Sequence, residues 1–147
     1  MKNIILSATL LLALSSATFA GTRNADPSLV KDLSSTLKKS PQVSWENKSK
    51  YKQASFSFKN KTASAFYSAD ENELIGFGIQ FKANDLPEDI ADIIKNKYKD
   101  WNVTDAIMFI DPSGNIDYYA EATKNNKRIV LKINPSGRIG FYANMPY

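Results

Sequence analysis

Residues 128–142, RIVLKINPSGRIGFY, carry an alternating hydrophobic pattern with one turn in the middle and predict a β-hairpin. Three aliphatic side chains share one face of the first strand: Ile129, Leu131 and Ile133. Gly137 suits the left-handed position of a type I turn followed by a bulge. Such a turn aligns Ile133 with Ile139 and Leu131 with Phe141, and this alignment sets the register of the hairpin.

The same alternation elsewhere predicts an antiparallel sheet with one apolar face. Strands are expected over residues 43–45, 52–58, 63–69, 75–81, 103–110, 116–122, 128–133 and 138–142. One helix is expected to begin at Pro27 after the capping Asp26 and to stop at Pro41. A second begins at Pro87. We expect its stripe to lie on the sheet: Ile90, Ile93, Ile94, Lys97, Tyr98 and Trp101.

The two halves of the chain look alike. An offset of 64 residues places Ala65 on Ile129 and Gly76 on Gly140. We therefore predict an α+β fold in which two similar helix-plus-antiparallel-sheet units, residues 26–82 and 85–143, form one sheet with the helices packed on one face. Chance similarity between alternating strands is the alternative explanation.

The N-terminal residues have the organisation of an export signal. A positive start at Lys2 precedes an apolar run, and Thr18-Phe19-Ala20 supplies small residues before Gly21. The run is shorter than a membrane span requires. We expect residues 1–20 to be removed, which leaves residues 21–147 as one soluble domain in the periplasm or outside the cell, without stable membrane insertion.

Composition excludes several kinds of chemistry. The chain contains no histidine and no cysteine, so a serine triad of the usual kind, a thiolate nucleophile and the commonest zinc ligands cannot be built. Nineteen basic and 15 acidic side chains give a net charge of +4 and are interspersed, a pattern typical of a solvated surface rather than a nucleic-acid interface. We expect no enzyme activity and no cofactor, although carboxylate chemistry stays open.

Several short patterns, in a particular order, make the chain similar to a known family. Val43-Ser44-Trp45-Glu46 precedes the strand 51–56, and Leu86-Pro87 starts a helix. With Tyr118-Tyr119 and Ile129-Val130-Leu131 before Gly137, the order resembles the PepSY-like family labelled beta-lactamase-inhibitor-like, over nearly all of residues 43–142. The resemblance implies exported bacterial proteins with helices on one side of an antiparallel sheet. It implies no assigned activity, and fold similarity alone does not carry function.

The strand pattern also predicts a contact surface. Residues on the sheet face away from the expected core include aromatic, aliphatic and basic side chains: Phe66, Tyr119, Val130, Lys132 and Tyr142. Aromatic residues of this kind commonly anchor protein interfaces. Burial under a helix or under the other half of the chain is the alternative.

Other candidate sites have simpler explanations. Asp111, Ser113, Asn115 and Asp117 alternate oxygen ligands, but Gly114 falls at the wrong position for an EF-hand, so a hairpin turn is expected instead of calcium. The acidic residues from Asp85 to Asp92 fit a helix start, and no metal is expected there. Trp45 and Trp101 flank apolar stripes and are expected in the core.

These observations predict an exported, non-enzymatic binding module, inhibitor-like in the manner of the family that it resembles. Its partner would be a protein or peptide recognised through the sheet face. A carboxylate-dependent hydrolase of an envelope polymer and a structural envelope component are the alternatives.

Overall fold

The computed structural model describes residues 25–145, so the predicted export signal and its cleavage site lie outside the described residues. The elements are α2 (Pro27–Lys39), β1 (Ser44–Asn47), β2 (Tyr51–Phe58), β3 (Lys61–Ser68), β4 (Leu74–Lys82), a 3₁₀ turn η2 (Ala83–Asp85), α3 (Glu88–Lys97), β5 (Asn102–Ile110), β6 (Ile116–Lys124), β7 (Lys127–Ile133) and β8 (Ile139–Asn144). Among these residues, no helix is both long and apolar enough to span a bilayer.

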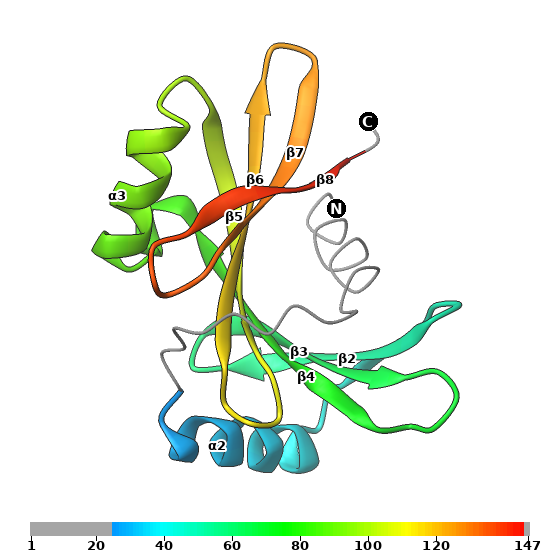
Figure 1. Ribbon diagram of the computed structural model, residues 1–147. Coiled ribbons are helices and arrows are strands. Elements are labelled where there is room, and N and C mark those ends of the chain that lie inside the picture. The colour runs from blue at the N-terminus through cyan, green and yellow to red at the C-terminus, as the bar shows by residue number, and fades with distance from the viewer. Residues whose placement is uncertain (1–24, 146–147) are drawn as a thin grey trace.

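The strands form a single eight-stranded antiparallel sheet in which each strand pairs with its neighbours in sequence, from β1 to β8. The prediction of an architecture of two helix-plus-sheet units is therefore wrong. The described chain is mostly sheet, with two α-helices beside it. In Figure 1, β2–β4 lie across the view and β5–β7 run up it, so the sheet twists strongly between β4 and β5.

Main-chain pairing joins the two halves of the chain within the sheet. β4 and β5 pair over six positions, from Phe77↔Ile110 to Lys82↔Asp105. The N–H of Ala25 also donates to the carbonyl of Gly114 at 2.6 Å, which ties the start of α2 to the loop between β5 and β6. Residues assigned to different halves are thus hydrogen-bonded to each other as neighbours within one sheet.

The helix cap and the β7–β8 turn that were predicted from the sequence are present in the structure. Asp26 caps α2, because its Oδ1 accepts from the N–H of Ser28 at 2.9 Å. Gly137 has a φ of +87°, the left-handed conformation that was predicted for it, and Asn72 also has a positive φ of +56°. The predicted pairs Ile133↔Ile139 and Leu131↔Phe141 are both present. The register expected for the β7–β8 hairpin is confirmed.

The helices bury one face of the sheet, which we call the helix face. Leu33 of α2 and Ile90 and Ile94 of α3 enter a continuous core with alternate residues of β2 to β8. α2 lies below β2–β4 in Figure 1, and α3 lies beside β5 and β8. Burial of this apolar surface is the main stabilising contribution to the fold.

A separate cluster occupies the opposite face of the sheet, which we call the aromatic face. Its buried members come from the strands and from the residue that follows β8: Tyr51, Phe66, Ile107, Phe109, Tyr119, Val130 and Met145. Neither α2 nor α3 contributes a residue to it. The sheet therefore carries apolar residues on both faces, and its strands do not have the one-sided pattern that the sequence predicted.

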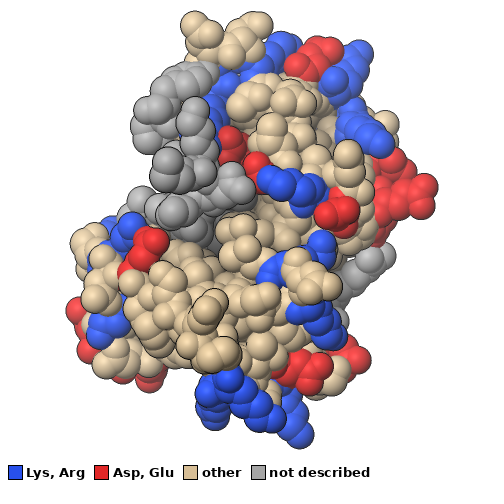
Figure 2. Space-filling view, turned by 180° about the vertical axis from the view of Figure 1, so that it is seen from behind, with Lys and Arg blue, Asp and Glu red and all other residues tan. Residues whose placement is uncertain are grey.

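Charged side chains are dispersed on the visible surface of the molecule. Figure 2 shows basic and acidic residues interspersed around uncharged areas, without a large area of one sign on the face in view. This arrangement agrees with the mixed, solvated surface expected from the charge pattern.

Candidate functional site

The structure places all five predicted contact residues on the aromatic face. Phe66, Tyr119 and Val130 are buried, with exposed fractions of 0%, 1% and 1%. Lys132 and Tyr142 are half-buried. The first three therefore form a packed platform, and the last two present atoms at the surface.

Tyr119 of β6 joins the two half-buried residues. Its ring meets the ring of Tyr142 edge to face, with centroids 5.0 Å apart. The ammonium nitrogen of Lys132, directly opposite in the register, lies 5.5 Å from the centroid of the Tyr119 ring. Burial raises the pKa of the Tyr119 hydroxyl, and the negative charge of Asp117 and the neighbouring Tyr142 raise it further. The Tyr119 hydroxyl consequently stays neutral in the folded protein over the ordinary pH range.

Ion pairs between β6 and β7 neutralise two carboxylates near Tyr119. Asp117 contacts the Lys132 ammonium at 2.9 Å. Glu121, only 8% exposed, pairs with the Arg128 guanidinium. The sequence analysis did not predict either pair. It could have done so, because each pair places opposite charges on the same face of two neighbouring strands. These carboxylates are held by cations, an arrangement better suited to shaping a surface than to general acid–base catalysis.

Glycines make room for the rings at the centre of the aromatic face. Phe66 packs with Tyr51 and Phe109, at centroid distances of 5.9 and 6.1 Å. A Cβ on Gly76 would lie 2.5 Å from the ring of Phe109, and one on Gly78 would lie 3.2 Å from that of Phe66. The two glycines of β4 thus allow the neighbouring strands to bring their aromatic rings over it.

A polar network adjoins this cluster on β2 and β3. The side-chain amide of Gln53 donates to Ser55 at 3.2 Å and to Ser64 at 3.0 Å, and the two hydroxyls lie 3.2 Å apart. Gln53 and Ser64 are both buried. The network satisfies polar groups that would otherwise be costly to bury.

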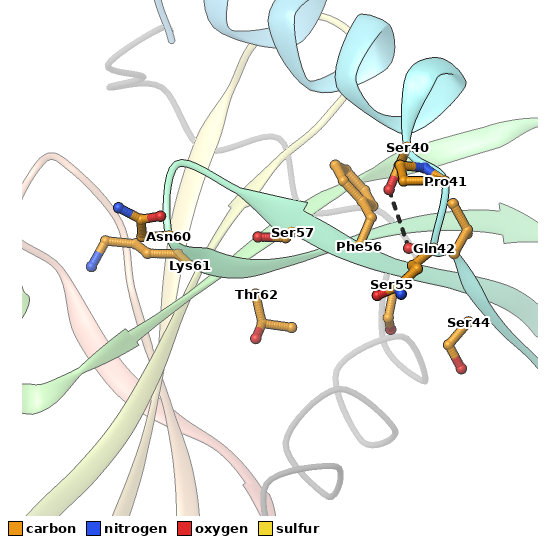
Figure 3. Close-up of a pocket in the computed structure, with 11 residues that line it drawn as sticks. Ser40, Pro41, Gln42, Ser44, Ser55, Phe56, Ser57, Asn60, Lys61 and Thr62 are labelled. Atoms are coloured by element: carbon orange, nitrogen blue, oxygen red, sulfur yellow. Dashed lines mark hydrogen bonds between the residues drawn. The ribbon is translucent and has the colours of Figure 1, made fainter.

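A groove of about 1050 Å³ extends from this network along the edge of β2. In Figure 3, Ser44 and Thr62 point to the side opposite Phe56, whose ring is directed toward α2. β1 pairs with β2 no further than Ser55, so no described strand covers the outer edge of β2 beyond that residue. The groove therefore combines hydroxyl side chains with a short uncovered strand edge.

Two other sequence predictions have clear outcomes. Trp45 is 57% exposed and not part of the core, so that prediction is wrong. It lies on the short edge strand β1 and contacts Tyr67 with ring centroids 5.9 Å apart. Trp101 is half-buried against the helix-face core, as expected.

The loop at Asp111 is a hairpin turn. The carboxylate of Asp111 accepts from the N–H groups of Ser113 and Asn115, at 2.8 and 2.9 Å. It also accepts from the Asn115 side-chain amide at 2.7 Å. Both carboxylate oxygens are thus used within the turn, as the hairpin interpretation predicted.

Comparison with solved structures identifies the fold. A DUF2874 family protein from Bacteroides uniformis superposes with a TM-score of 0.65 and 14% identity over 82% of this chain and 89% of that one. A BLIP-like protein from Bacteroides fragilis gives 0.60 and 16%, over 84% and 87% of the two chains. The chain has a BLIP-like fold. No protein-family model and no curated sequence matches it.

A third similar structure, a presumed periplasmic protein from Bacteroides eggerthii, has a TM-score of 0.61 and 14% identity over 81% of this chain and 90% of that one. Identities this low establish a shared architecture and nothing about activity. The PepSY-like resemblance seen in the sequence is not shown by these structures and stays a prediction.

Proposed function

We propose that this protein is an exported, non-enzymatic binding module that recognises a protein or peptide through the aromatic face. The observation that carries the proposal is the cluster on that face, which receives no side chain from either described helix. A sheet covered by helices on one face needs only one apolar core, between the helices and the sheet. The second apolar cluster, on the opposite face, is additional to that core.

The contact groups would be those at the surface of the platform. The ammonium group of Lys132 and the phenol ring of Tyr142 both contact the ring of the buried Tyr119. Tyrosine and basic side chains with restrained rotamers lose little conformational entropy on binding. The similarity to a BLIP-like protein is consistent with an inhibitor-like role.

Location in the periplasm or outside the cell is part of this proposal. The apolar run from Ile4 to Ala17 and the cleavage motif Thr18-Phe19-Ala20 support export, and one similar structure is a presumed periplasmic protein. Intact-mass measurement of the protein from its native host should give a chain that begins at Gly21. A product that retains Met1 would contradict export.

Site-specific photocrosslinking tests the binding face. We expect p-benzoylphenylalanine in place of Tyr142 to crosslink a partner in native cells. The matched control places the same group at Phe141, which is adjacent in β8, 58% exposed and on the helix face. Phe141 is paired with Leu131 of the helix-face core, whereas the ring of Tyr142 packs on Tyr119, so only position 142 should react.

Equal crosslinking at both positions, or none at position 142, would contradict recognition through the aromatic face. Turnover in a broad hydrolase screen, abolished by replacing one acidic residue without loss of folding, would favour the carboxylate enzyme instead.

A further inference from the structure

A cavity of about 490 Å³ separates α3 from the start of β5, on the side of the sheet away from the aromatic face. Its floor includes the buried Leu86 and Ile94, and the half-buried Val103 closes one side. The pairing of β5 with β6 shifts register between Val103 and Ala106. Irregular strand pairing of this kind commonly redirects side chains next to binding sites.

The cavity borders the packed side of α3. Ile90 and Ile94 are buried against the sheet, with exposed fractions of 1% and 4%. On the adjoining side of the helix, the small Ala91 lines the cavity and leaves its volume open. The apolar residues of the expected stripe all pack in or against the core, and the cavity lies beside this stripe.

An aromatic pair forms the wall beyond the end of α3. Tyr98 and Trp101 meet edge to face with ring centroids 6.3 Å apart, and the N–H of Trp101 donates to the carbonyl of Tyr98 at 2.9 Å. Both residues are half-buried, so each retains exposed ring surface toward the cavity. Such a wall is suited to an apolar ligand body.

Positive and negative side chains line opposite ends of the cavity. Lys95 and Lys99 line the end next to the aromatic pair, whereas Glu88 lies at the other end of α3. Helix geometry separates Glu88 from Lys95 by about 10 Å along the axis. Lys97 is directed elsewhere, because its ammonium donates to the carbonyl of Ile139 at 2.9 Å. A single anionic group is therefore best placed between Lys95 and Lys99.

We propose that this cavity binds a small apolar monocarboxylate, with its aliphatic or aromatic body against Trp101 and Ala91 and its carboxylate between Lys95 and Lys99. A volume of about 490 Å³ falls within the usual range for small-molecule sites. The site is independent of the proposed partner surface, which lies on the other face of the sheet.

Intrinsic fluorescence offers a local reporter. The chain has two tryptophans, and Trp45 is the exposed one on β1. In the Trp45→Phe protein, Trp101 is the sole indole and reports on the cavity wall. Titration with octanoate should give a saturable change in Trp101 fluorescence. Octylamine, which has a chain of the same length and the opposite charge, should bind at least tenfold more weakly.

Variants locate the binding. Lys95→Glu combined with Lys99→Glu should weaken octanoate binding at least tenfold. The matched control, Lys38→Glu with Lys39→Glu in the last turn of α2, should change it less than twofold. Ala91→Leu should weaken octanoate binding, because the larger side chain takes up part of the cavity, and circular dichroism of the variant verifies that it is folded.

Four results would overturn the proposal. They are the absence of a saturable response, equal binding of octanoate and octylamine, equal weakening by the two charge-reversal pairs, and an unchanged response in Ala91→Leu.

Discussion

Tyr119 lies where the contacts of the aromatic face converge. Its ring touches Tyr142 and the Lys132 ammonium, and its side chain is almost fully buried. A buried residue in this position mainly stabilises the fold, and it affects recognition only by positioning its neighbours. Measurements of stability and of partner capture therefore have to be made on the same variants.

Tyr119→Ala should lower the free energy of unfolding by about 3 kcal/mol or more, because it removes a buried ring and leaves a cavity. Urea denaturation followed by circular dichroism measures this loss. Tyr142→Ala, which truncates a half-buried ring, should cost clearly less. Equal stability of Tyr119→Ala and wild type would show that the aromatic cluster is not a core.

Tyr119 should also make the protein sensitive to alkali. The pKa of its hydroxyl is raised in the folded state, chiefly by burial and then by Asp117 and Tyr142. Above the unfolded-state pKa of about 10, the unfolded chain releases a proton that the folded protein keeps. The stability contributed by this group is thus complete below pH 10 and is lost as the pH rises beyond it.

Urea denaturation at pH 9 to 11.5 tests this dependence. Tyr119→Phe should reduce the alkaline slope of stability by up to about 1.4 kcal/mol per pH unit, the value for one proton. The raised pKa values of Tyr51 and Tyr67 add to the slope in both proteins and cancel in the comparison. Identical slopes would refute the raised Tyr119 pKa.

The β7–β8 hairpin shows how a single turn sets the position of a whole strand. The N–H of Gly137 donates to the carbonyl of Asn134 at 3.0 Å, and the N–H of Asn134 donates to that of Arg138 at 3.0 Å. With Gly137 at a φ of +87°, the turn absorbs one extra residue and aligns Ile133 with Ile139. Side-chain parity on β8 depends on this alignment.

Gly137→Ala should destabilise the protein by about 1 kcal/mol, because a left-handed conformation penalises a Cβ. Gly140→Ala is the matched control in the same hairpin, since a Cβ there meets nothing within 4 Å. Gly140→Ala should be neutral or slightly stabilising. Thermal melts of the two variants measure the difference, and the reverse order of stability would contradict this account of the turn.

Across the whole molecule, the unbroken sheet implies one cooperative unit. The pairs between β4 and β5 and the hydrogen bond from Ala25 to Gly114 join segments that sequence similarity had separated. Loss of either half would expose the paired edge and the core of the other. The apparent repeat in the sequence therefore does not mark independently folding parts.

Unfolding of the mature chain should occur in one transition, with coincident midpoints by circular dichroism and by tryptophan fluorescence. Residues 85–143 expressed alone should lack dispersed amide resonances in an NMR spectrum. Two separate transitions, or a folded fragment, would show that the β4–β5 contact is only a weak junction.

Local chemistry made much of this structure predictable. The cap at Asp26, the left-handed Gly137 and the alternation along the strands depend on only a few residues each, so they can be predicted from the neighbouring sequence. Strand parity also placed Phe66, Tyr119 and Tyr142 on one face. A period-two pattern determines which side chains share a face without reference to the rest of the chain.

Long-range packing decided the rest. The alternation does not specify that β4 would pair with β5 across the apparent boundary, or that Trp45 would lie exposed on an edge strand. It also does not reveal that glycines in β4 let rings pack over it, or that α3 would leave a cavity beside Ala91. These features depend on contacts between residues far apart in the chain, whose geometry is set only when the sheet twists and the helices dock.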